Sequence, residues 1–437
     1  MRQMYCFPLI QGIGAKAAPT VVKGDNICRG QLLAYIEEGK MGCPIYSSVS
    51  GIVKEVSENE IVIDADEKQE ATYIKLTETE PLKLIQKAGI VGLGGAGFPT
   101  YVKLSGKFQG EGTVIINAAE CEPILEHNIR AIEENPKQLL RGLEIAMDIT
   151  GAKRGIIAIK EIHEKAITKL KEALGESEQK EKIRVTLLPN MYPMGEERAV
   201  IRETLGKLLS VTSLPLEADA IVINAETACR IQEAVDLKKP LIDKNMTVAG
   251  KIKGCEKENI IKVLMDVPIG KSVGSILDEQ GGCREGYGEI IMGGPFTGKR
   301  TEPDKPVVKT TGGLIVTECF PKGPEKIGLL VCACGADEKR LREIAESLGS
   351  SVVGVESCKQ AIPVKNTLKC ENPGKCPGQV QKIMKLKKAG AQAVLISNCT
   401  DCSNTVMSCA PKLGLPVYHC TDQANRAVNI KLIRKIH

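Results

Sequence analysis

The feature that most constrains the fold is an alternation, between residues 80 and 235, of strand-like apolar runs and amphipathic helical stretches. The strand-like runs read TVIINA, RGIIAIK, IRVTLLP and ADAIVINA, and the helical stretches include 135–147 and 162–174. Strands separated by helices favour a mainly parallel sheet with helices on its faces, because a parallel crossover needs an intervening segment. We therefore expect an α/β domain with ligands outside the carboxyl ends of its strands.

Polar clusters follow three of these predicted strands: NAAECEP from residue 117, YPMGEE from residue 192 and NAET from residue 224. A glycine-rich loop, GLGGAGFPT from residue 92, precedes the first strand. Glycine has no Cβ and tolerates positive φ, so the backbone N–H groups of such a loop can turn toward a phosphate or a flat ring. A helix starting near Pro99 would add the positive end of its dipole. We expect the loop and the clusters to share one crevice.

The composition excludes several classes of protein. A length of 437 residues favours two to four domains, and a net charge of +5, from 59 basic and 54 acidic residues, indicates neither nucleic-acid nor membrane-surface binding. The sequence shows no apolar run of the roughly 20 residues that a membrane-spanning helix needs, and no signal peptide. We expect a cytoplasmic protein. Ten of its 17 cysteines lie at or beyond Cys319, which in a reducing compartment indicates metal or thiol-redox chemistry.

Two further segments are rich in predicted strands. Residues 1–75 contain short β runs in two halves, typical of a small sandwich of the lipoyl-carrier kind. The bend at Ser50-Gly51 offers no carrier lysine, so we interpret this segment as a structural β domain. Residues 239–300 combine a strand, MTVAGKI, with a helical run, VGSILDEQGG, and the prolines of 301–324 predict a linker.

The C-terminal segment, 325–437, repeats one pattern four times: a predicted strand that finishes in cysteine. The runs are KIGLLVCACG, SSVVGVESC, AQAVLISNCTDC and LPVYHC. Helical stretches separate most of them, so the sheet should be parallel and its carboxyl edge lined with thiols. Cys370 and Cys376 lie in the loop after the second strand and are expected to fold over the same edge.

The pair Cys399 and Cys402 forms a C-x-x-C motif where a predicted strand gives way to a helix. In this thioredoxin-like arrangement the helix N-terminus stabilises the thiolate of the first cysteine, although Asp401 opposes the effect. A disulfide accepts two electrons, so this dithiol suits a two-electron donor.

The motifs GLGGAGFPTYVKL, INAAECEP, YPMGEE and INAET, in this order and spacing, resemble the RnfC-like family over roughly residues 1–320. They are also similar, more distantly, to the flavin-bearing, NADH-binding subunit of respiratory complex I. The resemblance implies a multidomain α/β protein. Its expected parts are a barrel-sandwich hybrid β domain (1–75), an α/β FMN- and NADH-binding domain (76–238), an SLBB-like β-grasp module (239–300), a linker (301–324) and a parallel, cysteine-rich α/β redox domain (325–437).

The same resemblance implies cofactor-binding residues. Those implied for FMN are Gly92, Gly94, Gly95, Gly97, Lys103, Asn117, Gly195, Glu196, Glu197, Asn224 and Thr227. Those implied for NADH are Phe98, Tyr192, Glu120 and Glu122. The complex I protein has a basic residue where Leu93 stands and an acid where Ala119 stands, so NADH contacts are expected to be weaker than those of FMN.

RnfC-like proteins normally carry two ferredoxin-type cysteine runs, and this sequence has neither. Its layout resembles the proline reductase-associated (PrdC-like) electron-transfer proteins of amino-acid-fermenting anaerobes. This implies a route from NADH through FMN to the catalytic pair Cys399 and Cys402, and on to a partner reductase such as a D-proline reductase-like selenoenzyme.

Two alternatives remain open. The first is an iron–sulfur cluster on the cysteine edge, since thiolates are the usual ligands of such clusters. Its candidate ligands are Cys332, Cys334, Cys358, Cys370, Cys376, Cys399, Cys402 and Cys420. The second is a non-catalytic docking or scaffold protein that has kept the fold.

Overall fold

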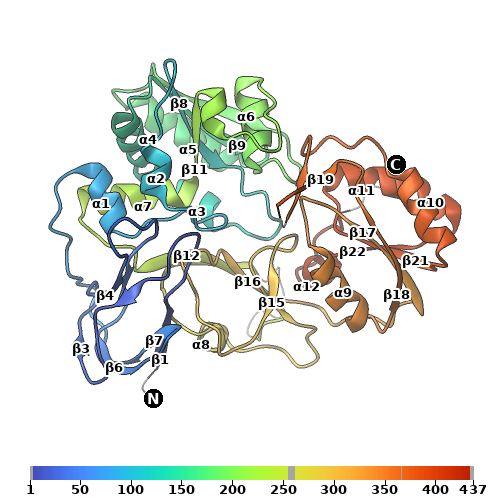
Figure 1. Cartoon of the computed structure of the whole chain (residues 1–437), viewed down its shortest axis with the longest axis horizontal. Helices are drawn as coiled ribbons and strands as arrows, with labels where there is room; N and C mark the ends of the chain where they lie inside the picture. Colours follow the sequence, from blue (N-terminus) through green and yellow to red (C-terminus); the bar gives the residue numbers. More distant parts are fainter. Residues whose placement is uncertain (1–2, 254–260, 366, 434–437) are drawn as a thin grey trace.

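The computed structural model describes residues 3–253, 261–365 and 367–433, which fold into four parts that follow one another along the chain (Figure 1). An N-terminal β domain is followed by a helix-covered sheet, a second sheet and a C-terminal α/β unit. Residues 254–260 of the predicted β-grasp module and 434–437 of the predicted redox domain lie outside the described residues. No helix in the described ranges is long and apolar enough to cross a membrane.

The N-terminal domain consists of two small antiparallel sheets around a buried core that includes Phe7, Leu33 and Ile63. Gly51 begins a strand there, and a Cβ on it would lie 2.3 Å from the carbonyl oxygen of Asp64. Close strand packing therefore explains this glycine. One sheet has the order β1 (Met4–Pro8), β7 (Glu60–Ala65), β6 (Gly51–Val56), β3 (Asn26–Ile27), and the other β2 (Ala18–Pro19), β4 (Leu32–Tyr35), β5 (Ile45–Tyr46).

The second part is an all-parallel sheet in the order β10-β9-β8-β11. It confirms the predicted α/β pattern, because the four predicted runs are its strands and the helical stretches at 135–147 and 162–174 are α4 and α5. The strands are β8 (Thr113–Ala118), β9 (Arg154–Lys160), β10 (Ile183–Leu188) and β11 (Ala220–Asn224). The helices are α1 (Pro81–Lys87), α2 (Thr100–Leu104), α3 (His127–Glu134), α4 (Pro136–Thr150), α5 (Glu164–Gly175), α6 (Glu197–Leu205), the 3-10 turn η1 (Pro215–Ala218) and α7 (Ala225–Asp236).

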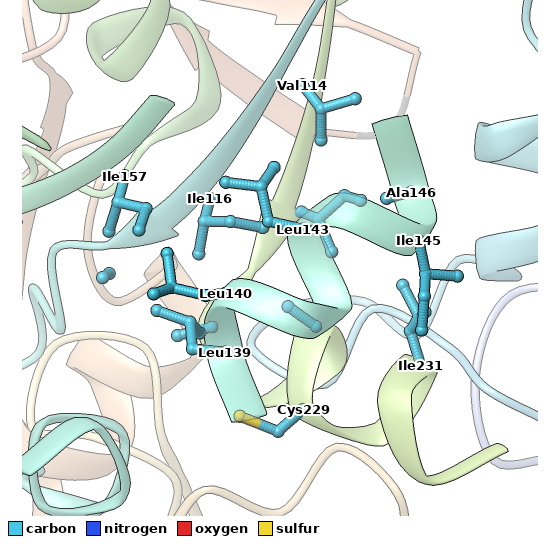
Figure 2. Close-up of a cluster of buried hydrophobic side chains, with 14 of the residues drawn as sticks. Val114, Ile116, Leu139, Leu140, Leu143, Ile145, Ala146, Ile157, Cys229 and Ile231 are labelled. Carbon is cyan, nitrogen blue, oxygen red and sulfur yellow. The ribbon is translucent and has the colours of Figure 1, made fainter. Parts of the chain in front are cut away.

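Helix α4 illustrates how this sheet is covered. The Asn135 side chain accepts a hydrogen bond from the backbone N–H of Gln138 at the start of the helix, and Gly151 ends it with a left-handed φ of 73°. Between these signals its apolar stripe packs on the sheet, where Leu143 lies against Ile116 (Figure 2). Helix α6 covers the opposite face.

The third part is a mixed, five-stranded sheet, and it corrects the predicted domain boundary. Strand β16 pairs with β12 and β14 in the middle of this sheet, so residues 313–316 are core, not linker. The predicted strand and helix at 246–252 and 273–282 correspond to β12 and α8. The elements are β12 (Asp243–Gly250), β13 (Ile261–Pro268), α8 (Val273–Glu279), β14 (Ile290–Met292), β15 (Lys299–Thr301) and β16 (Gly313–Val316).

The C-terminal unit is a parallel sheet in the order β18-β17-β21-β22, as its repeated pattern predicted. Helix α9 packs on one face, and α10 and α11 pack on the other. The strands are β17 (Lys326–Val331), β18 (Ser351–Ser357), β21 (Ala393–Ile396) and β22 (Val417–His419), with a separate hairpin of β19 (Ala361–Val364) and β20 (Thr367–Cys370). The helices are α9 (Glu338–Ser347), α10 (Val380–Lys388), α11 (Thr400–Cys409), the 3-10 turn η2 (Pro411–Leu413) and α12 (Asp422–Ala427).

Lys309 lies in the segment predicted as a linker, but its side chain is buried and connects three parts of the molecule. Its Nζ donates hydrogen bonds to the carbonyl oxygens of Pro44, at 2.7 Å, and Gly89, at 2.8 Å. Burial lowers the pKa of Lys309 from 10.5 to about 8. Between pH 8 and 10.5 the unfolded chain therefore binds the proton more strongly than the folded chain does. The stability that this group contributes rises with pH in that window.

We expect Lys309→Met to remove this pH dependence. Wild-type unfolding free energy should gain up to about 1.4 kcal/mol per pH unit from this lysine between pH 8 and 10. Urea unfolding at several pH values measures the slope, and Lys305→Met, at an exposed lysine, is the control. Equal slopes for wild type and Lys309→Met would show that Lys309 titrates normally.

Candidate functional site

The glycine-rich loop presents an open stretch of backbone. Gly94, Gly95 and Ala96 are exposed, and a Cβ on Gly95 would meet no atom within 4 Å. Gly94 has a different reason to be glycine, because a Cβ there would lie 2.4 Å from Asn224 Nδ2. The loop is anchored to α7, because the Leu93 N–H donates a hydrogen bond to Thr227 Oγ1 at 3.0 Å. A planar ligand can therefore approach the backbone at Gly95 without displacing a side chain.

The loop lies over the carboxyl edge of the sheet, as predicted. Asn117 is the last residue but one of β8 and Asn224 ends the neighbouring β11, and the two residues are partners in the strand register. Asn224 Oδ1 accepts the N–H groups of Glu226 and Thr227 at 3.0 and 3.3 Å and so caps α7. Asn117 Nδ2 donates to the Gly195 carbonyl at 2.8 Å. The positive end of α7, a helix of 12 residues, thus lies beside the loop, whereas α2 after Pro99 has only five residues.

Two adjacent glutamates at the start of α6 have different roles. Glu196 caps the helix, accepting the N–H groups of Arg198 and Ala199 at 2.9 and 3.0 Å. Glu197 forms an ion pair with Lys103, whose Nζ is 2.9 Å from Glu197 Oε1 and 2.9 Å from the Val222 carbonyl oxygen. Lys103 therefore joins α2 to the strand β11 and to α6 at the predicted site.

Glu120 and Glu122, both predicted to contact NADH, are buried in other contacts. Glu120 has a left-handed φ of 37°, and its Oε2 accepts from Asn128 Nδ2 at 2.7 Å. Burial raises the pKa of Glu120 to about 7, against the hydrogen bonds from Asn128. Glu122 accepts the N–H groups of Phe296 and Thr297 at 2.8 and 2.9 Å, so its carboxylate binds the third part of the chain. The sequence around Glu122 gives no indication that its carboxylate contacts Phe296 and Thr297.

Tyr192 also departs from its predicted place as an aromatic neighbour of NADH. Its ring stacks on Phe296 with centroids 3.6 Å apart and an interplanar angle of 1°, and it is 6% exposed. Its hydroxyl donates to the Cys334 carbonyl, and its backbone N–H donates to Thr400 Oγ1 at 3.0 Å. Tyr192 therefore joins the α/β domain to the C-terminal unit. Phe98, which is half-buried, stays in the glycine-rich loop segment.

A buried ionic network behind α7 was missed from the sequence. Glu226 and Lys244 form a fully buried ion pair, and Glu226 Oε1 also accepts the N–H of Asn245 at 2.7 Å. Arg230 donates to Asn245 Oδ1 at 2.9 Å and to Asp266 at 2.8 Å. Of these residues, only Glu226 belongs to a motif recognised in the sequence. Lys244 and Asn245 come from β12, and Asp266 comes from β13. The network fixes α7, and with it Asn224, against the third part.

The cysteines predicted to line the C-terminal sheet edge converge. They form a chain of hydrogen-bonded thiols in which Cys370 contacts Cys334, Cys334 contacts Cys332, and Cys332 contacts Cys358. From there the chain continues to Cys402, which contacts both Cys376 and Cys399. We call these residues the cysteine network: Cys332, Cys334, Cys358, Cys370, Cys376, Cys399 and Cys402. Cys420 directly follows β22, with its Sγ 3.7 Å from His419 Nδ1.

One buried side-chain amide, that of Gln379, donates hydrogen bonds to three sulfurs of this network. Gln379 Nε2 lies 3.1, 3.5 and 3.7 Å from the Sγ atoms of Cys358, Cys376 and Cys402. Hydrogen bonds from the Cys332 and Cys402 thiols lower the pKa of Cys358 to about 3, and those from Cys402 and Thr405 lower that of Cys376 to about 6. The same thiol contacts raise the pKa of Cys402. The network thus combines two cysteines whose pKa is lowered with a neighbouring one whose pKa is raised.

The predicted C-x-x-C pair is placed as expected at a strand-to-helix transition, but it is buried. Cys399 is the N-cap residue of α11, and both its side chain and that of Cys402 are buried. Every cysteine in the described ranges is a free thiol. Within those ranges, no group of three or more His, Cys, Asp or Glu side chains is arranged to hold a metal ion.

The C-terminal unit packs on the edge of the α/β domain that carries the candidate site. Arg202 Nη1 donates to Asn372 Oδ1 at 2.6 Å and to the Pro373 carbonyl at 2.8 Å. Arg198, one turn before it on α6, donates to the carbonyl of Cys370. The cysteine network therefore begins directly against α6, whose first residue is paired with Lys103.

These features define a class of protein: an α/β domain with a glycine-rich ligand loop, joined to a thiol-rich unit. Family models match the RnfC barrel sandwich hybrid domain over residues 1–78 and the Nuo51 FMN-binding domain over residues 85–233. A component of the proton-translocating ferredoxin:NAD(+) oxidoreductase complex of Clostridium ljungdahlii is 34% identical over 329 residues, which are 70% of this chain and 69% of that protein. The chain therefore belongs to the RnfC-like family, and its residues 85–233 form an FMN-binding domain.

Other relatives cover different shares of the chain. A component of the Na(+)-translocating ferredoxin:NAD(+) oxidoreductase complex of Acetobacterium woodii is 31% identical over 74% of this chain and 75% of that protein. The cobalamin reductase PduS of Citrobacter freundii is 37% identical over 53% of this chain, and the match spans 48% of that reductase, about half its length. A chain of an NAD+-reducing NiFe-hydrogenase matches with a TM-score of 0.46 and 21% identity, over 55% of this chain and 48% of that one.

Proposed function

We propose that this chain is an NADH-dependent electron-transfer flavoprotein that passes two electrons to the thiols of its C-terminal unit, and from there to a partner reductase. The observation that carries the proposal is the contact between the two units. The FMN-binding domain packs, through α6 and Tyr192, directly on the cysteine network. Relatives named as ferredoxin:NAD(+) oxidoreductase components and cobalamin reductases support the reaction class.

The residues present fit FMN. The loop Gly92, Gly94, Gly95 and Gly97 leaves its backbone open at Gly95, and the side-chain amides of Asn117 and Asn224 and the positive end of α7 lie beside it. Lys103 would stand near the polar edge of the ring, and the Gly195-Glu196-Glu197 turn and Thr227 would complete the cradle. Bound FMN would supply the chemistry that accepts a pair of electrons from NADH and passes them on.

NADH contacts are proposed for Phe98, in the loop segment, and for Glu120, two residues after β8, whose carboxylate would have to exchange its hydrogen bond from Asn128 for the ligand. The Glu120 carboxyl has a pKa raised to about 7, so it can hold or release a proton near neutral pH. Tyr192 and Glu122 are each held by Phe296, so we propose positioning roles for them at the contact between units.

Within the cysteine network we propose Cys399 and Cys402 as the dithiol that takes electrons inside the protein. The two thiols are hydrogen-bonded to each other and are the C-x-x-C pair at the start of α11. Thiol-disulfide exchange carries two electrons without a metal. A cytoplasmic partner reductase of the D-proline reductase kind would then be reduced through its own disulfide or selenenylsulfide. The third part, 243–316, is interpreted as an SLBB-like β-grasp module.

We expect Cys399→Ser and Cys402→Ser to keep NADH-dependent dye reduction while losing at least about tenfold in the rate of reduction of a disulfide acceptor. The reason is that a serine hydroxyl cannot form a disulfide, so the pair can no longer be oxidised and reduced by two electrons. Stopped-flow assays with NADH and either ferricyanide or oxidised glutathione measure the two rates. Cys409→Ser, at a cysteine of the same helix outside the network, is the control. Wild-type disulfide rates in both variants would exclude the dithiol route.

A second candidate places an iron–sulfur cluster on the cysteine network, whose seven sulfurs form one continuous chain of contacts. The cysteines would have to rearrange around the cluster, because in the described residues they are not grouped to hold a metal ion. Iron and acid-labile sulfide, assayed on anaerobically purified protein, separate the two candidates. A scaffold protein without redox activity would instead be colourless after incubation with FMN and inactive toward NADH and dye.

A further inference from the structure

Cys376 is the end of the cysteine network that faces solvent. Of the network cysteines only Cys334 and Cys376 are partly exposed, and the backbone of Cys334 faces Tyr192 of the FMN-binding domain. The Cys376 sulfur receives the Gly378 N–H at 3.4 Å and lies 3.1 Å from Thr405 Oγ1, just before the first turn of α10. Donors and a helix N-terminus around one accessible sulfur favour a nucleophilic thiolate.

The chain segment that contains Cys376 is strongly basic, and the Cys376 backbone N–H itself donates to Asp401 Oδ2 at 2.6 Å. Residues 359–388 contain eight lysines and a single acidic residue, Glu371, so this segment exceeds the net charge of +5 of the whole chain. Seven of these lysines are exposed, and Lys382 and Lys385 pair with Glu356. Lys359, Lys369 and Lys375 make no ion pair with any residue in the described ranges. The rest of the chain is nearly balanced in charge, so this concentration is local.

We propose that Cys376 and Cys402 form the pair that reduces the partner, with Cys376 attacking a disulfide presented on an acidic protein surface that the lysines of 359–388 bind. This inference rests on the proposed function for its source of electrons. It differs from that function in assigning the outward step to Cys376, which the C-x-x-C motif does not include. Opposite charge on the two surfaces would steer the encounter and set its salt dependence.

The chemistry balances as two exchanges. The Cys376 thiolate attacks one sulfur of the partner disulfide, forming a mixed disulfide and releasing the other partner sulfur as a thiolate. Cys402 then attacks Cys376 Sγ, which forms the Cys376–Cys402 disulfide and frees the second partner thiol. The partner has gained two electrons and two protons. Cys399, hydrogen-bonded to Cys402, next attacks Cys402 Sγ to give Cys399–Cys402 and restore the Cys376 thiol. NADH reduces that inner disulfide under the proposed function.

The first test needs neither NADH nor flavin. Reduced, anaerobic protein, freed of reductant, is mixed with a dianionic disulfide, 5,5'-dithiobis(2-nitrobenzoate), or a dicationic one, cystamine. Mass spectrometry of quenched digests then follows each cysteine, with exposed Cys28 as the internal reference. We expect Cys376 to react first and to prefer the dianion over the dication by at least about tenfold more than Cys28 does, a preference lost in about 0.5 M salt.

Variants test the roles of Cys402, Cys399 and the lysines one at a time. In Cys402→Ser the mixed disulfide at Cys376 should accumulate, whereas in Cys399→Ser it should be resolved as in wild type. Lys359→Glu/Lys369→Glu/Lys375→Glu should reverse the charge preference at Cys376. The control, Lys153→Glu/Lys171→Glu/Lys180→Glu, changes the net charge equally at exposed lysines of the α/β domain and should leave the preference intact.

Three results would overturn the inference: Cys376 reacting no faster than Cys28, an unchanged preference in the first lysine variant, or release of the mixed disulfide in Cys402→Ser. Protection of Cys376 until iron is chelated would also overturn it, in favour of a cluster. NADH-dependent dye reduction, measured separately on the FMN-loaded protein, tests the proposed function. Its loss with normal Cys376 reactivity would reject that function while leaving the thiol assignment standing.

Discussion

Gly95→Val protein should fold like wild type and retain less than about a tenth of the bound FMN, which corresponds to at least about 1.4 kcal/mol of lost binding free energy. The reason is that a Cβ at Gly95 meets no atom within 4 Å in the protein, so the side chain can be added there without a clash at its Cβ. Its methyl groups would instead fill the space above the open backbone of the loop, where the flavin ring is proposed to lie. FMN released by heat and measured by fluorescence gives the occupancy.

The matched control is Gly175→Val, at a helix-end glycine outside the site that also has open space around its Cβ. We expect this variant to keep full FMN occupancy. Gly94 is unsuitable for the test, because a Cβ there would strike Asn224 and disturb the loop itself. Full occupancy in Gly95→Val would remove the loop from the flavin site.

Lys244→Met should cost about 3 kcal/mol of local stability, because it leaves the buried Glu226 carboxylate without its nearest cation. Burial by itself would raise the pKa of Glu226, but Lys244 and Arg230 outweigh burial and hold it below 4.5. The stability from this charge is therefore present above pH 4.5 and is lost as pH falls through the lowered pKa.

Hydrogen exchange at the amides of α7 measures this effect at about pH 7, and we expect acceleration by on the order of 100-fold in Lys244→Met. The control is Lys137→Met, which breaks a short ion pair, 2.7 Å to Glu176, between exposed side chains. Exposed pairs contribute about 0–1 kcal/mol, so this control should exchange almost like wild type. Equal protection of α7 in both variants would show that the Glu226–Lys244 pair does not hold the helix.

The local patterns of the sequence predicted the scaffold of the site. The alternation of strands and helices placed Asn117 and Asn224 at one sheet edge, and the structure makes them register partners. Four cysteine-ended strands predicted a thiol-lined edge, and the thiols do converge there. Both results follow from periodicity and from the geometry of parallel sheets, which act within short segments.

Contacts between distant segments could not be predicted in the same way. Glu122 and Tyr192 looked like ligand contacts, but Phe296, more than 100 residues later, binds one and stacks on the other. The prolines after residue 300 suggested a linker, yet Lys309 is buried against two other parts of the chain. A linear pattern carries no information on which buried charge meets which carbonyl or carboxylate, because that depends on how the domains pack.

A count of thiols during turnover tests the proposed electron route from NADH to the cysteine network most directly. FMN-loaded protein with its cysteine network oxidised, free of iron by assay, is given limiting NADH under argon, and new thiols are alkylated and located by mass spectrometry. About two new thiols should appear per NADH oxidised, at Cys399 and Cys402 and then at Cys376. Oxidation of NADH without new thiols, or protein that takes up no FMN at all, would contradict that route.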